Sequence, residues 1–169
     1  GEEESGSESL VPFLQEHKDA LKADTCIVCD TGMWDPETPA ITSRLRGLVY
    51  IEATLHGPSH DLHSGSYGGA VVNPANALTA ILGQLHDSEG KVQIDGFYDD
   101  VEIVSTEQIA QWNALGDADA LTLESSGAKV TFGEKGYSTL ERLWSRPTCD
   151  INGLRAGYIG EGAKTVIGA

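Results

Sequence analysis

The sequence predicts a fold in which helices and strands are mixed, of the α/β or α+β class. Apolar residues recur with helical spacing in some segments and alternate as in strands in others. A predicted helix and strand at residues 10–29 lead to Asp30, and a carboxylate at the carboxyl end of a strand is typical of an α/β sheet. Hydrophobic residues form 40% of the 169 residues, enough for a core, and 20 Gly with 6 Pro indicate many turns.

The first half of the chain contains two predicted helices and two predicted strands. A helix is expected at residues 10–23, with Ser7 or Ser9 as its cap. A buried strand at 25–29 follows, and a second strand is expected at 48–55. Residues 73–86 predict a helix with Pro74 in its first turn.

The second half is expected to be mostly helical, with short strands between the helices. Helices are expected at residues 106–115, 118–123 and 137–144. Short strands are expected at 91–94 and 150–158, and the glycine-punctuated stretch 160–167 is expected to be a loop.

The charge excludes two classes of partner. The chain carries 26 acidic against 11 basic residues, for a net charge of -15. Nucleic acids and anionic membranes bind clustered Lys and Arg, so neither is expected as a partner. No apolar run approaches the roughly 20 residues of a membrane span, and the start lacks the pattern of a secretory signal.

The three cysteines favour a reducing compartment, and we expect a cytoplasmic protein. Cys26 and Cys29 lie an odd number of positions apart on the expected strand, so their side chains would point to opposite faces. They are therefore expected to be buried thiols rather than ligands of one metal ion.

The loop at residues 59–69 is the most informative stretch. It holds His60 and His63, followed by small residues on both sides of Tyr67, and ordered loops of about a dozen residues are usually functional. Two histidines three positions apart would form a poor zinc site without further ligands. The adjacent acids near the start are by themselves typical of solvated surface.

Five blocks, taken in order, resemble the carnosinase and cytosolic dipeptidase branch of the di-zinc aminoacyl peptidases. The blocks are Glu3-Glu4-x-Gly-Ser with Asp30, Arg46-Gly47, Asp61-Leu62-His63-Ser64-Gly65 with Gly68-Gly69 and Asn73-Pro74, residues 138–144, and residues 160–167. Together they span nearly the whole chain. The resemblance implies an α+β chain, with residues 1–46 as a partial catalytic domain and 47–169 as part of a two-layer lid that mediates homodimerisation.

The resemblance also implies roles for individual residues. Glu3 would be the general base, while Glu4 and Asp30 would each bind one of two zinc ions, with manganese as another possible metal.

In the same family the equivalent of His63 reaches into the active site of the partner subunit and donates to the oxyanion. Thr165 corresponds to a lid residue that contacts the small peptide substrate. Asn73 and the glycines are interpreted as shaping the loop.

The implied function is zinc-dependent hydrolysis of dipeptides or short amides. The alternatives are deacylation of an N-acyl amino acid and a metal-free dimerisation or binding module. A His-x-Asp motif, a late histidine ligand and a substrate-binding Arg expected from the family are absent, and Gly168 stands where Pro is usual. We therefore expect an internal slice of such an enzyme, inactive by itself.

Overall fold

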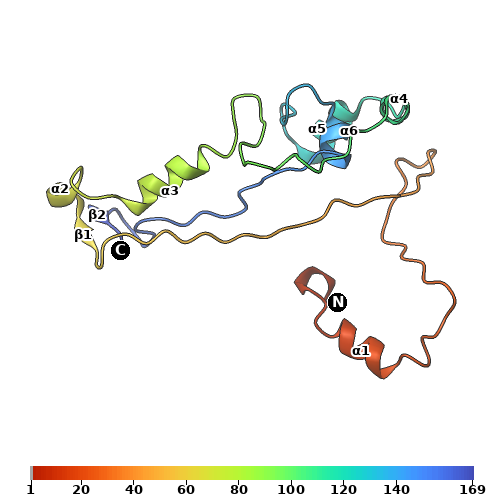
Figure 1. Cartoon of the computed structure of the whole chain (residues 1–169), viewed down its shortest axis with the longest axis horizontal. Coiled ribbons are helices and arrows are strands. Elements are labelled where there is room, and N and C mark those ends of the chain that lie inside the picture. The colour runs from red at the N-terminus through yellow and green to blue at the C-terminus, as the bar shows by residue number, and fades with distance from the viewer. Residues whose placement is uncertain (1) are drawn as a thin grey trace. The chain divides into compact units, whose positions relative to one another are not determined.

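The computed structural model describes residues 2–169, apart from the side chain of Glu3, and contains the helices and the small sheet of an α+β chain (Figure 1). The α+β class is confirmed. The chain divides into two compact units, with the boundary in the sequence between Arg44 and Leu45. None of the helices in the described residues is long and apolar enough to cross a membrane.

The first unit contains a short 3-10 helix, η1 (Glu3–Ser5), and one α-helix, α1 (Leu10–Glu16). The helix ends earlier than expected, and turns continue to residue 21. No residue of α1 is buried, so tertiary packing does not stabilise a further turn.

The strand expected at residues 25–29 is wrong. The segment has no ladder partner, and Ile27 and Val28 are 79% and 78% exposed. A strand needs a neighbour for its backbone hydrogen bonds, and the sheet found in the described residues pairs only two other segments. The expectation of buried thiols is therefore also wrong for Cys26 and Cys29, which are both exposed.

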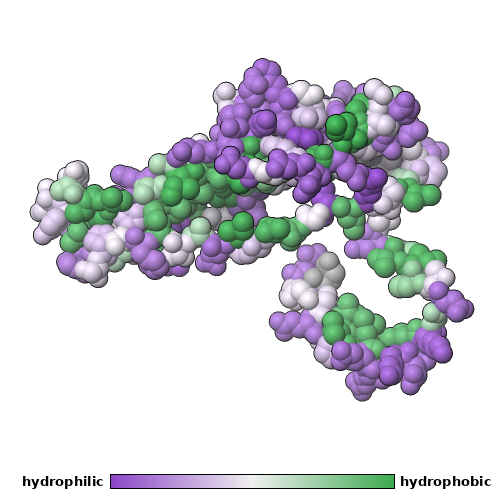
Figure 2. Space-filling view, viewed as in Figure 1, coloured by the Kyte–Doolittle hydropathy of each residue, from purple (hydrophilic) through white to green (hydrophobic). Residues whose placement is uncertain are grey.

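The second unit begins with an extended segment and then forms its sheet. The strand expected at 48–55 is wrong for the same reason: Leu48 is 90% exposed and the segment lacks a ladder. Apolar side chains remain on the surface here and elsewhere (Figure 2). The observed sheet consists of β1 (Leu62–His63) and β2 (Val166–Ile167), paired antiparallel. Sequence analysis missed β2, which was expected to be loop.

The remaining elements of this unit are helices. After β1 come α2 (Ser64–Tyr67) and α3 (Pro74–Leu82), and then α4 (Thr106–Asn113), α5 (Ala118–Ser126) and α6 (Thr139–Trp144). The helices expected at 73–86, 106–115, 118–123 and 137–144 are confirmed within a few residues, except that α3 ends at Leu82. The strands expected at 91–94 and 150–158 are wrong, apart from one bridge between His86 and Val92.

The caps explain why these helices begin where they do. Asn73, Ser105, Asp117 and Ser138 each accept a backbone N–H of the first turn through their side chains. Ser138 also forms a capping box with Glu141, which satisfies two N–H groups reciprocally. Gly127 ends α5 in the left-handed conformation, at φ +68°.

Buried apolar residues are few, and polar contacts supplement them. Val92, Leu140 and Ile167 are buried. Near α6, Arg146 forms a two-pronged ion pair with Glu134, at 2.7 and 2.8 Å, and lies over the rings of Tyr98 and Tyr137. The hydrogen bonds that Arg146 donates to the Glu134 carboxylate raise the pKa of Arg146 above its usual value.

Replacement of Ile167 tests the packing of β2. Ile167 is 2% exposed, so Ile167→Ala should lower the free energy of unfolding by about 2–5 kcal/mol through lost burial and a cavity. Ile159, which is 57% exposed, is the matched control, and Ile159→Ala should change the free energy of unfolding by no more than about 0.5 kcal/mol. Urea unfolding of the two variants measures the difference, and equal losses would contradict the burial of β2.

Candidate functional site

The pairing of β1 with β2 joins the loop at residues 59–69 to the end of the chain. Leu62 pairs with Ile167, and His63 pairs with Val166. Just beyond the ladder, the Ser64 N–H donates to the Thr165 carbonyl at 3.0 Å. The Ala169 N–H donates to the Asp61 carboxylate at 3.0 Å. The two segments are thus held together on both sides of the ladder.

This pairing brings together the two side chains expected to contact substrate. His63 Nε2 lies 3.3 Å from Thr165 Oγ1, although the residues are 102 positions apart in the sequence. The other ring nitrogen, Nδ1, accepts the Gly65 N–H at 3.0 Å and caps α2. Both His63 and Thr165 are exposed, so both can reach a ligand.

The glycines of the loop are needed for close contacts. A Cβ on Gly65 would lie 2.6 Å from His63 Cε1, and a Cβ on Gly68 would lie 2.4 Å from the Ser64 carbonyl oxygen. Real Cβ atoms essentially never approach so closely. The small residues therefore let the chain turn tightly around the imidazole.

Asn73 and Gly57 fix the position of α3 next to this loop. The Asn73 amide oxygen accepts the Ala75 N–H at 2.9 Å, and Pro74 occupies the first turn. A Cβ on Gly57 would lie 2.2 Å from Pro74 Cγ and 3.0 Å from the Gly168 carbonyl oxygen. Gly57 therefore allows three segments to meet: the approach to the loop, the start of α3 and the end of β2.

The contacts described for His60 do not connect it to His63 or Thr165. Its Nδ1 contacts the Ser59 hydroxyl at 3.1 Å, while Thr165 contacts His63. The two imidazoles of the loop thus have different surroundings, which makes His60 a useful control for His63.

The residues expected to bind metal lie in the first unit. Glu4 and Asp30 are exposed, and the side chain of Glu3 lies outside the described residues. Among the side chains that the structure describes, no group of three or more His, Cys, Asp or Glu could hold a metal ion. Two separate carboxylates are too few for a zinc site, so these residues alone do not fit the expected metal centre.

Sequence analysis missed the role of Glu2. Its carboxylate accepts the Ser9 hydroxyl at 2.6 Å and the Ser9 N–H at 2.9 Å, next to the start of α1. These hydrogen bonds, the hydroxyl's first, lower the pKa of Glu2 below its usual value. Glu2 therefore organises the turn that carries Glu3 and Glu4. In the sequence, the one indication of this contact is that Ser9, a possible helix cap, follows Glu2 by seven positions.

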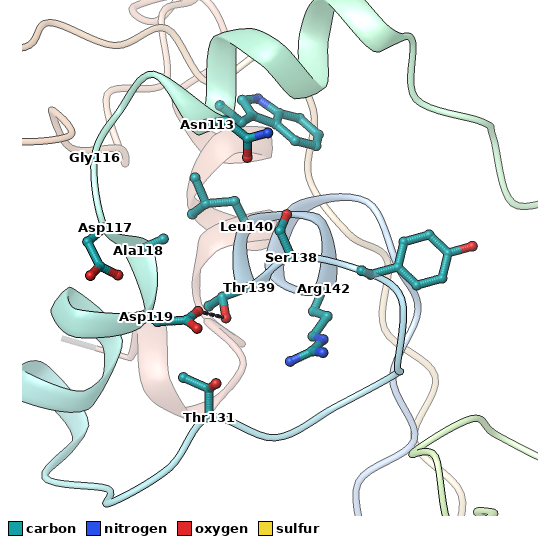
Figure 3. A pocket seen from close by; sticks show the side chains of 12 residues that line it. Asn113, Gly116, Asp117, Ala118, Asp119, Thr131, Ser138, Thr139, Leu140 and Arg142 are labelled. Carbon is teal, nitrogen blue, oxygen red and sulfur yellow. Dashed lines mark hydrogen bonds between the residues drawn. The ribbon is translucent and has the colours of Figure 1, made fainter.

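A cavity of about 350 Å³ lies beside α4, α5 and α6 (Figure 3). Asp119 accepts a hydrogen bond from Thr139 there, and Asp117 and Ser138 cap the two helices. Arg142 donates its Nε–H to the Glu134 carbonyl at 2.9 Å. Of these contacts, the one between Asp119 and Thr139 joins two helices, while the others hold helix starts and a loop, so each of these polar groups already has a partner in the chain.

Comparison with known proteins gives a consistent result. Residues 44–169 match the family model of the peptidase dimerisation domain. The Cys-Gly metallodipeptidase of Schizosaccharomyces pombe is 34% identical over 171 residues, which cover 100% of this chain and 36% of that protein. The human Beta-Ala-His dipeptidase is 32% identical over 170 residues, which cover 99% of this chain and 33% of that protein. The chain thus spans about a third of the length of these curated relatives.

Solved structures show the same relationship. A metallo-carboxypeptidase from Sulfolobus solfataricus is 30% identical, with a TM-score of 0.64, covering 99% of this chain and 38% of that one. Human carnosine dipeptidase 1 is 32% identical, with a TM-score of 0.56, covering 66% of this chain and 24% of that one.

Replacement of Gly57 tests how the loop is held. Gly57→Ala places a methyl group against Pro74 and Gly168, and such overpacking costs about 1–3 kcal/mol. Exchange of the Ser64 amide, which is bonded to Thr165, should then accelerate about tenfold, the factor that corresponds to about 1.4 kcal/mol. Gly47→Ala is the control, because a Cβ there meets open space. Unchanged exchange in Gly57→Ala would show that the close approach of the three segments is not required.

Proposed function

Because the chain belongs to the peptidase dimerisation domain family, we propose that it forms part of a metal-dependent dipeptidase that acts as a homodimer. The resemblance to carnosinase and the cytosolic dipeptidases is confirmed by relatives named as a Cys-Gly metallodipeptidase and a Beta-Ala-His dipeptidase. Their names favour a dipeptide substrate over an N-acyl amino acid. The activity is proposed for the full-length gene product.

The observation that carries this proposal is the contact between His63 and Thr165. Both residues are exposed, and the 3.3 Å contact between Nε2 and Oγ1 places an imidazole and a hydroxyl side by side. Hydrolysis of an amide builds negative charge on the carbonyl oxygen, and donors fixed in advance stabilise that charge. We assign His63 the donor role and Thr165 contact with the substrate, in the active site of the partner subunit.

The order of sequence blocks supports the other assignments. Residues 1–46 are proposed as part of the catalytic domain and residues 47–169 as part of the lid. Glu3 is proposed as the general base, and Glu4 and Asp30 as ligands of two metal ions, zinc or manganese. Carboxylate oxygens are suitable ligands for zinc and for manganese alike. Further donor groups are needed to complete the coordination of each ion. A reducing, cytoplasmic location is proposed from the odd number of cysteines, three, which does not suit a disulfide scaffold.

Loss of the His63 side chain should slow catalysis without removing metal. In the full-length gene product, His63→Ala should lower kcat by about 10²–10³, because an oxyanion donor acts mainly in the transition state. Metal content should stay unchanged. His60→Ala is the matched control and should keep kcat, because its imidazole contacts Ser59 instead. A wild-type kcat in His63→Ala would contradict the donor role.

Mixed dimers test whether His63 acts across the dimer. In a heterodimer of one His63→Ala chain and one Glu3→Ala chain, cross-subunit action leaves one complete site, and action within one chain leaves none. Purified mixed dimers should therefore regain about half of the wild-type activity, and free exchange between equal amounts of the two inactive homodimers, which makes about half of the dimers mixed, should restore about a quarter, by that count of sites. No recovery, with subunit exchange confirmed by mass spectrometry, would exclude the cross-subunit role.

Metal content separates the roles of the neighbouring glutamates. In the full-length gene product, Glu3→Ala should abolish turnover and keep its metal, whereas Glu4→Ala should also weaken one metal site. Glu8→Ala, at another exposed acid, is the control and should change neither property. Loss of metal in Glu3→Ala, with the rate per bound metal ion preserved, would mean that the two roles are exchanged.

The 169-residue chain alone is expected to show no peptidase activity.

A further inference from the structure

We propose that Gly65 is a positioning residue for His63: its N–H fixes the imidazole tautomer, and its missing Cβ leaves room for the ring. The inference rests on the proposed function for its catalytic meaning. Its structural content concerns Gly65, His63 and Thr165 alone, and it can be tested without any measurement of activity.

The tautomer follows from the donor at Gly65. A backbone N–H can only donate, and His63 Nδ1 lies 3.0 Å from the Gly65 nitrogen with the geometry of a hydrogen bond. Nδ1 must therefore be the unprotonated nitrogen of the neutral ring. A neutral imidazole carries one proton, so that proton is on Nε2.

The position of the proton sets the direction of the next hydrogen bond. His63 Nε2 lies 3.3 Å from Thr165 Oγ1, and because Nε2 carries the proton, the hydroxyl oxygen accepts. The hydroxyl's own proton is then available to a ligand. The exposed pair thus offers the Thr165 hydroxyl proton and suits an oxygen that accepts a hydrogen bond, such as a carbonyl, a carboxylate or a tetrahedral oxyanion.

Space, rather than backbone conformation, explains the glycine at position 65. Gly65 is not among the glycines with positive φ, whereas Gly69 nearby has φ +83°. Other residue types can therefore adopt the backbone of Gly65. A Cβ there would lie 2.6 Å from His63 Cε1 and 3.0 Å from Nδ1, so an alanine would displace the ring from its observed position.

The direct test is a scalar coupling between the two nitrogens of the hydrogen bond. The full 169-residue chain, labelled with ¹⁵N, is measured at a pH of about 8, above the reference histidine pKa of about 6.5. His63→Gln identifies the signals of His63 among those of the five histidines. We expect a coupling between the Gly65 amide nitrogen and His63 Nδ1, with the ring proton on Nε2.

Three variants separate the contact from general folding. Gly65→Ala should lose the coupling, whereas Gly168→Ala should keep it, because a Cβ on Gly168 meets only an ordinary contact at 3.9 Å. Thr165→Val should also keep the coupling, since it removes only the partner of Nε2. Absence of the coupling in the wild-type chain, or its survival in Gly65→Ala, would overturn the inference. The wild-type result decides the matter if Gly65→Ala does not fold.

Kinetics of the full-length gene product test the positioning role. Gly65→Ala should lower kcat at least about tenfold, and the double variant with His63→Ala should be no slower than His63→Ala alone, because Gly65 acts through His63. Losses that multiply in the double variant would overturn the positioning role. A normal kcat in His63→Ala would reject the proposed donor function, while the coupling would still report the tautomer.

Discussion

The candidate site depends on the antiparallel pairing of β1 with β2. Closing a loop of more than one hundred residues costs conformational entropy, and a ladder of two residue pairs returns few hydrogen bonds. Further contacts therefore have to hold the pairing. Ile167 is buried, and the hydrogen bonds of Ser64 with Thr165 and of Ala169 with Asp61 extend it on both sides. Without this pairing, nothing described in the structure would bring His63 close to Thr165, which lies 102 positions later in the sequence.

Once the strands are paired, local constraints determine what His63 can do. The ring is held at one nitrogen by a backbone donor and at the other by a hydroxyl, so its proton has a defined position and direction. The pair thus presents the Thr165 hydroxyl proton to a ligand without reorganisation, whereas direct donation by His63 requires its Nε2–H to turn from Thr165 to the ligand. With a net charge of -15, the electrostatic field of the whole chain disfavours a negatively charged oxygen at the site. Stabilisation of such an oxygen therefore has to come from hydrogen-bond donors that point directly at it.

Local signals in the sequence predicted the helices well, and non-local pairing explains the failures. Asn73 with Pro74, and Ser138 with Glu141, mark helix starts through contacts a few residues apart. The segments at 25–29 and 48–55 have the composition of strands, but a strand also needs a partner. The proximity of His63 and Thr165 could not be derived from spacing. The resemblance suggested a common role for them, and the contact itself came from the structure.

The donor pair is built entirely within the second unit. Asp61, His63, Gly65, Thr165 and Ala169 all lie after Arg44, and each contact that fixes the imidazole is made among them. The proposed base and metal ligands lie in the first unit, so the geometry of the donor does not depend on them. If residues 47–169 form the proposed lid, that lid can present the same donor to a catalytic centre of its own chain or of a partner. The arrangement of the proposed homodimer would then decide between the two, because the contacts that fix the donor are all made within the second unit.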